Sequence, residues 1–212
     1  MIDLSFRING ARAKRSAAVP TLVFDLGVSE ARGLPVSGIA LNCQIRIEPQ
    51  RRAYSPKEEG KLLELFGEPP RWRDTLKPFF WTQVSLMISS FEESTEVPMP
   101  IGFSYDFEVG SAKYFHALDD GEIHTLFLFS GMSFAKGEHG LLVAPIPWSK
   151  EARYRLPVRV WRELMDAYYP ESGFLRLQRE TLDALLRFKA ERALPTWDGV
   201  VEELLKSSER GP

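Results

Sequence analysis

The chain has 212 residues, of which 44% are hydrophobic and 12% aromatic, and its formal net charge is −2 at pH 7. This composition is typical of a packed globular protein and excludes an unstructured chain. The near balance of 27 basic and 29 acidic side chains argues against nucleic acid or an anionic membrane as a partner of the whole surface. A chain of this length buries roughly 70% of its unfolded surface, so it needs neither a metal nor a disulfide to fold.

Cysteine usage and hydropathy indicate the compartment. Cys43 is the only cysteine, which excludes an intrachain disulfide and a cysteine-based zinc site. It lies in an alternating apolar stretch and is expected to be a buried, unreactive side chain. Residues 1–18 contain several charged side chains and no apolar run as long as that of a signal peptide. No later segment approaches the ~20 apolar residues of a membrane span, so we expect a cytoplasmic protein that does not enter a membrane.

The β-rich part of the chain is expected over residues 21–147, after a poorly ordered or edge N-terminal arm at 1–20. Apolar and polar residues alternate over 21–29 and 39–47. A period of two residues predicts half-buried strands with one face in water, as in an antiparallel sheet.

One short helix is predicted near 56–66. Ser55 and Glu58 have the spacing of a capping box, and Pro56 stands at the first helical position. Gly67 is expected to end the helix.

Further strands are predicted after an ordered loop at 68–80. Asp-Asp-Gly at 119–121 and the KGEHG sequence at 136–140 indicate hairpin turns between them. With the two earlier strands they make about seven, which favours an antiparallel β-sandwich or a strongly curled sheet. The expected strands are 81–91, 101–109, 112–118, 122–134 and 141–146.

The period changes after Trp148, and residues 148–206 are predicted to form a three-helix segment packed on the β-rich domain. Its first helix begins at Pro157, carries apolar residues at spacings of three and four, and ends at Pro170. The second and third helices are expected near 179–193 and from Thr196 onward, with a frayed tail at 207–212. The predicted fold class is therefore α+β.

Two histidines are the first candidate site. If 119–121 is a three-residue loop, His116 and His124 lie opposite each other with Cβ atoms about 5 Å apart. A two-residue turn instead separates them. No third ligand is evident, so two ordinary histidines on a sheet face are favoured over a metal site.

A second candidate is the carboxylate pair Asp106 and Glu108. Two residues apart on a strand, they share one face at about 7 Å, a separation that suits an inverting glycosidase. The alternation itself places polar residues on that face, so a solvated surface explains the pair equally well and is favoured.

Basic and aromatic residues form a third candidate. Arg51 and Arg52 lie close to Tyr54, and Trp72 lies between two further arginines. Arginine beside exposed aromatics is typical of protein interfaces and of single-strand binders. Nearby glutamates dilute the positive charge, which favours a protein interface or solvated arginines over nucleic acid.

Phe188 is the remaining candidate contact. At 100° per residue it lies about 120° from the centre of the leucine stripe of its predicted helix. It is either covered by the neighbouring helix or available to a partner.

Four stretches carry a family resemblance: LNCQIRIEPQRRAY at 41–54, VPMPIGFSYDFEV at 97–109, IPWSKEARYRLPVRVWRELMDAYYP at 146–170 and LRLQRETLDALLRFKAERALPTWDGVVEELL at 175–205. Together they resemble an uncharacterised bacterial family, classed as a domain of unknown function, whose genes in actinobacteria and other bacteria are associated with those for uptake nickel–iron hydrogenases and their accessory proteins. The resemblance implies an accessory or assembly role by association, and it carries over no catalytic residue or cofactor.

The sequence has no Gly-rich phosphate loop, nucleophile elbow or His-x-x-x-His pair. We therefore expect a non-catalytic protein-binding or assembly factor whose partner is another protein, with hydrogenase or maturation subunits as candidates. The alternatives are a small hydrolase or carbohydrate-active enzyme using the Asp106 and Glu108 face, and a chaperone-like holdase. The oligomeric state is left open.

Overall fold

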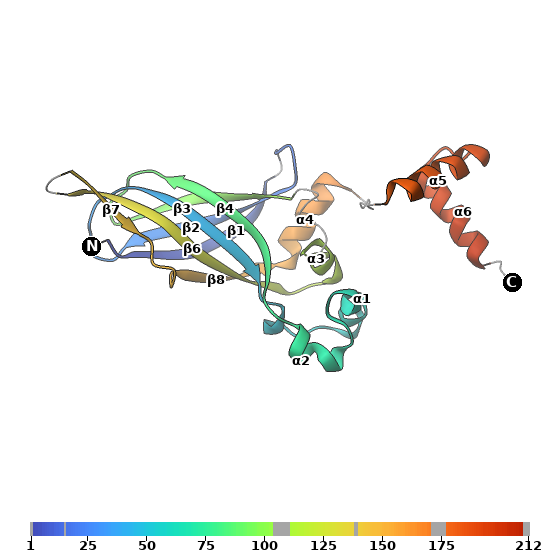
Figure 1. Ribbon diagram of the computed structural model, residues 1–212, viewed down its shortest axis with the longest axis horizontal. Coiled ribbons are helices and arrows are strands. Elements are labelled where there is room, and N and C mark those ends of the chain that lie inside the picture. Colours follow the sequence, from blue (N-terminus) through green and yellow to red (C-terminus); the bar gives the residue numbers. More distant parts are fainter. Residues whose placement is uncertain (1, 15, 104–110, 138–139, 171–176, 210–212) are drawn as a thin grey trace. The chain divides into compact units, whose positions relative to one another are not determined.

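A computed structural model describes residues 2–14, 16–103, 111–137, 140–170 and 177–209. The chain divides into two compact units, Met1–Pro170 and Glu171–Pro212 (Figure 1). Among the described residues, no helix is both long enough and apolar enough to span a bilayer.

The first unit contains two antiparallel sheets (Figure 1). One has three strands in the order β1-β2-β5. The other has the order β4-β3-β6-β7, with β8 also paired to β6. The strands are β1 (Leu4–Lys14), β2 (Thr21–Glu30), β3 (Val36–Ile47), β4 (Phe79–Ile88), β5 (Ser94–Gly102), β6 (Glu122–Gly137), β7 (Gly140–Pro145) and β8 (Glu151–Pro157).

Side chains of both sheets meet in one core. The rings of Phe6 and Phe129 stack with centroids 4.4 Å apart, and Phe24 meets Phe127 edge-on at 5.1 Å. Contacts of β1 with β8 and of β4 with β5 join the sheets along two sides. The predicted antiparallel α+β fold, with a sandwich of sheets, is confirmed, although the described part has eight strands and not seven.

The period-two alternation in β2 and β3 predicts the buried faces correctly. Leu22, Phe24 and Leu26 of β2 are fully buried, as are Ile39 and Cys43 of β3. The predicted burial of Cys43 is confirmed, and desolvation raises the pKa of its thiol to about 12.

Helix α1 (Pro56–Phe66) begins as its sequence predicts. Ser55 Oγ accepts a hydrogen bond from the Glu58 N–H at 3.3 Å, and Glu58 Oε2 accepts one from the Ser55 N–H at 2.9 Å. Gly67 follows the last turn with a φ of 73°. The predicted loop after it contains one 3₁₀ turn, η2 (Pro69–Arg71), the short helix α2 (Trp72–Thr75) and the start of β4. Another 3₁₀ turn, η1 (Pro49–Arg51), lies between β3 and α1.

The predicted strand at 112–118 is wrong. Residues Lys113–Ala117 form helix α3. Tyr114 and Phe115 are consecutive and both fully buried, as is Leu118. A strand with one wet face buries every second residue, whereas a helical turn directs neighbours and residues three or four apart toward the same core.

Two strands, β1 and β8, and most of a third, β5, lie where the sequence predicts no strand. β1 occupies most of the expected N-terminal arm and forms the edge of its sheet, with Leu4, Phe6 and Ile8 buried. β8 lies in the region assigned to helices, and buries Leu156 against the core. β5 begins at Ser94 and ends at Gly102, so it coincides with the strand predicted at 101–109 only over Ile101 and Gly102, and residues 104–109 lie outside the described residues.

Helix α4 (Val158–Tyr168) belongs to the first unit, so the division of the chain falls after Pro170 and not at residue 148. Val158, Trp161 and Leu164 are buried in the core shared with the sheets. The Tyr168 hydroxyl fixes the helix to the segment that follows β1, since it accepts the Ala17 N–H at 2.9 Å.

The second unit contains α5 (Arg179–Glu191) and α6 (Trp197–Glu209). The two helices contact each other, and the Arg192 guanidinium lies 3.1 Å from Glu203. Two of the three predicted C-terminal helices thus form a unit of their own.

Candidate protein-interaction surface

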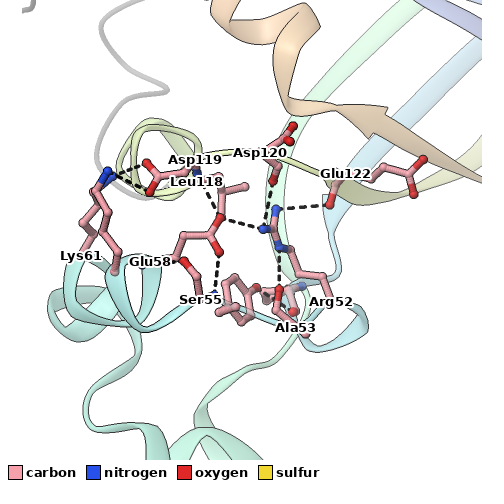
Figure 2. Close-up of polar contacts among 12 residues, drawn as sticks. Arg52, Ala53, Ser55, Glu58, Lys61, Leu118, Asp119, Asp120 and Glu122 are labelled. Carbon is pink, nitrogen blue, oxygen red and sulfur yellow. Dashed lines mark hydrogen bonds and ion pairs between the residues drawn. The ribbon is translucent and has the colours of Figure 1, made fainter.

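A polar network of the first unit surrounds Glu58 (Figure 2). Arg52 Nη2 lies 2.7 Å from Glu58 Oε1, and the same oxygen accepts the Asp119 N–H at 3.0 Å. Arg52 also donates to the carbonyl oxygens of Ala53 and Asp120. The network joins the start of α1 to the chain that leads into β6, so its role is structural.

Burial and hydrogen bonds set the ionisation of this network. Burial raises the pKa of Glu58, but the Ser55 and Asp119 N–H groups and the Arg52 guanidinium outweigh it and hold that pKa below its ordinary value. Burial also raises the pKa of Tyr54 to about 12 and raises the pKa of Tyr114. The two phenol oxygens lie 2.9 Å apart.

The predicted basic and aromatic contacts fall in different environments. Arg51 is half exposed and pairs with Glu48 at 2.9 Å. The Arg52 side chain is only 10% exposed, and Trp72 is buried with its indole N–H donating to the Gly67 carbonyl oxygen. Burial leaves little of Arg52 or Trp72 for a partner to contact, which the sequence could not show because both lie in a polar segment.

The two histidines do not lie opposite each other. His116 is on α3, where its ring meets Trp161 edge-on with centroids 4.7 Å apart. His124 is on β6 and pairs with Arg155 of β8. Partial burial and the Arg155 charge lower the pKa of His124. Within the described ranges, no three His, Cys, Asp or Glu side chains gather as metal ligands. Asp106 and Glu108 lie outside the described residues.

An exposed apolar surface surrounds β7, and sequence reasoning missed it. Leu141 is 65% exposed, and Leu142 and Val143 are about half exposed. Consecutive residues of a strand point to opposite faces, so both faces of β7 are accessible. We call this strand, with Met132 of β6 and Met87 of β4, the β7 surface.

The register explains how these residues form one surface. Met87, Ala40, Met132 and Pro145 lie in one row across β4, β3, β6 and β7. Val143 pairs with Phe134 two residues further along β6, on the same face as Met132. Neighbouring strands are about 4.8 Å apart, so the apolar side chains are contiguous across the sheet.

Among the described strands, none pairs with the second edge of β7. β7 ends the strand order of its sheet, and it lies at the end of the unit remote from α1 and α2 (Figure 1). Strands β8 and β4 contact the other sheet. Within the described part of the chain, β7 has no comparable contact with any strand except β6.

Gly131 lies at the point where β6 changes its pairing partner from β8 to β7. β6 pairs with β8 over its first half and with β7 over its second half. Gly131 lies between the two halves with a φ of 130°, and a Cβ there would be 2.0 Å from the Ala40 carbonyl oxygen. Glycine therefore permits the close approach at which β6 changes neighbours. Trp148, in the connection from β7 to β8, is 90% exposed.

Phe188 lies on α5 and is half-buried, with the Arg192 guanidinium carbon 5.1 Å from the centre of its ring. Its arginine neighbour thus covers one face of the ring. Two leucines of the same helix are more exposed than Phe188: Leu182 at 39% and Leu186 at 46%.

One family model matches the chain over its whole length. Residues 1–212 match the model of a family of unknown function (DUF6084). The chain belongs to this family. Membership confirms the coarser part of the resemblance, an uncharacterised family. No curated protein matches the chain.

Solved structures show only slight similarity. A β-glucosidase from Kluyveromyces marxianus matches 73% of this chain and 15% of its own, with a TM-score of 0.28 and 8% identity. β-Glucosidase 3B from Thermotoga neapolitana matches 73% of this chain and 17% of its own, with a TM-score of 0.26 and 11% identity. The chain thus spans less than a fifth of these enzymes, and similarity at this level supports no inference about activity.

Proposed function

We propose that the protein is a non-catalytic accessory or assembly factor that binds an extended segment of another protein along β7. The observation that carries the proposal is the combination in β7 of two exposed apolar faces and one edge with which no described strand pairs. Peptides add to such edges through backbone hydrogen bonds, while side chains of alternate residues enter the surface on each face.

The composition of the strand favours this mode of binding. Residues 140–145, GLLVAP, carry no charge. Exposed sheet edges are usually protected by lysine, by bulges or by covering segments, because an unprotected edge pairs with other chains. The partner segment is therefore expected to be extended and apolar, with few charges.

The family resemblance supplies the first candidate partners. Genes of the resembling family accompany those for nickel–iron hydrogenases, so hydrogenase and maturation subunits are the first partners to test. Interaction in the cytoplasm is part of the same proposal. Asp106 and Glu108, on which the enzyme alternative depends, lie outside the described residues.

The test is affinity purification of the tagged full-length chain from its native host. We expect a stoichiometric partner with the wild-type chain and with Leu63→Lys, which alters an exposed leucine of α1. The double variant Leu141→Lys/Val143→Lys should lose it, because lysine blocks edge pairing. Equal recovery of the partner by the double variant would exclude β7 as the binding edge.

A second measurement separates a specific factor from a chaperone-like holdase. The purified partner is added to the chain, and amide hydrogen exchange of residues 140–145 is followed. Protection by the partner, with no protection by an unrelated unfolded protein, is the result expected of an assembly factor. Equal protection by both proteins would support the holdase instead.

A further inference from the structure

We propose that α5 and α6 of one chain pair with α5 and α6 of a second copy to form a four-helix interface. This inference is independent of the β7 surface and rests on burial and charge in the second unit. The occupant to which we commit is a second copy of the chain, arranged with α5 of each copy against α6 of the other.

The second unit buries too little to be stable alone. α5 has no buried side chain, and among the described residues of the unit only Val200 is buried. The unit spans Glu171–Pro212, close to the ~40 residues below which domains usually need a disulfide, a metal or association. The only cysteine is in the first unit, so a disulfide within the unit is excluded.

Both helices present an apolar stripe that is open to solvent. Successive residues turn by about 100° in a helix, which places Leu182 and Leu186 on one side of α5. On α6 the stripe is wider and includes an aromatic ring. Its members are Trp197, Val201, Leu204 and Leu205, each between 37% and 59% exposed.

The rims of the two stripes carry opposite charge. Arg179 and Arg187 border the stripe of α5, with Asp183 between them, so this rim is net positive. Asp198 and Glu202 border the stripe of α6 beside Leu205.

Several of these charges are available to a partner. Arg179, Arg187 and Asp198 form no ion pair with another residue in the described part of the chain. Glu202 reaches only the exposed Lys206, at 3.9 Å.

Symmetry makes a second copy the complement of this surface. In a two-fold pair the same patch is used on both chains, so α5 against α6 of the other copy occurs twice. Each occurrence brings a basic rim to an acidic rim and covers one leucine stripe with another. Pairing α5 with its own copy would instead oppose arginine to arginine.

The test measures the mass of the full-length chain by sedimentation equilibrium over a range of concentrations. We expect a concentration-dependent dimer of the 24.2 kDa chain. Leu186→Glu/Val201→Glu should give a monomer, whereas Met87→Glu, a matched change at an exposed residue of the first unit, should leave the dimer intact. A wild-type chain that is monomeric at every concentration overturns the proposal, because a different protein or the first unit would then have to cover the apolar stripes.

Charge exchange keeps the proposal testable if the glutamate variant unfolds the second unit. Arg187→Glu should weaken the dimer about tenfold, because the ion pair that it breaks occurs twice in the dimer and each exposed ion pair contributes a fraction of the change. Adding Asp198→Arg should restore the dimer, because both ion pairs form again with their charges exchanged. Failure of the second change to restore association overturns the arrangement of α5 against α6. A dimer that survives Leu186→Glu/Val201→Glu but is lost in Leu141→Lys/Val143→Lys overturns it as well.

Discussion

Arg52 Nη2 lies 2.7 Å from Glu58 Oε1, and the two side chains are only 10% and 5% exposed. The same carboxylate accepts the Ser55 N–H on its other oxygen and the Asp119 N–H beside the guanidinium. One side chain therefore caps α1, neutralises a buried arginine and holds the segment that leads into β6.

Replacing Glu58 by alanine should lower the free energy of unfolding by about 3 kcal/mol. The change leaves the Arg52 charge buried without its partner, and breaking a buried pair costs more than the pair contributes. It also removes half of the capping box of α1. Urea denaturation of the variant and the wild type measures the difference.

The matched control is Arg52→Met/Glu58→Leu, which removes both charges and keeps apolar volume. We expect it to be more stable than Glu58→Ala, because no unpaired charge remains. A double variant less stable than the single variant would show that the hydrogen bonds to the Ala53 and Asp120 carbonyl oxygens matter more than the charge pair.

Acid should weaken the fold through the same carboxylate. Burial raises the pKa of Glu58, yet its backbone hydrogen bonds and Arg52 hold that pKa below the ordinary 4.5. A lowered pKa in the folded chain means that the stabilisation is present above pH 4.5 and is lost as the pH falls below it. Urea midpoints at neutral pH and at decreasing pH should show a smaller loss for Glu58→Gln than for the wild type. Equal losses would assign the acid effect to other carboxylates.

Two tryptophans with opposite exposure test the extent of the core. Trp161 of α4 is 4% exposed and packs beside Phe115, whereas Trp148 is 90% exposed. Trp161→Ala should lower the free energy of unfolding by about 3–5 kcal/mol, and Trp148→Ala should change it by less than about 0.5 kcal/mol. Comparable losses in thermal unfolding of the two variants would contradict the placement of α4 in the first unit.

Two glycines with opposite surroundings test the change of partner along β6. A Cβ at Gly131 would lie 2.0 Å from the Ala40 carbonyl oxygen, whereas one at Gly60 of α1 would meet nothing within 4 Å. Gly131→Ala should therefore destabilise the chain strongly, and Gly60→Ala should stabilise it by about 0.5–1 kcal/mol, because alanine is the better helix former. A Gly131→Ala chain that melts like the wild type would show that β6 relaxes at this position.

Local patterns predicted the elements whose conformation depends on near neighbours. The alternation in β2 and β3 gives the buried face correctly, and the Ser55 and Glu58 pair gives the start of α1, because strand period and helix capping act within a few residues. The spacing of Val158 and Trp161 likewise gives α4. Residues 113–117 were misread because Tyr114 and Phe115 are both apolar, and two adjacent apolar residues suit a buried strand as well as a helix.

The candidate site depended on contacts between distant residues. Arg52 and Trp72 lie in a polar segment of the sequence, but inside the fold Arg52 donates to the carbonyl oxygen of Asp120, and Trp72 packs edge-on against Tyr54. Leu141 and Ile45 are equally apolar in the sequence, and the sequence therefore determined that both favour burial. Only the tertiary structure decided that Ile45 is covered and Leu141 exposed, because Ile45 faces the other sheet, whereas Leu141 lies with Val143 and Met132 on the face of its sheet that is turned away from the core.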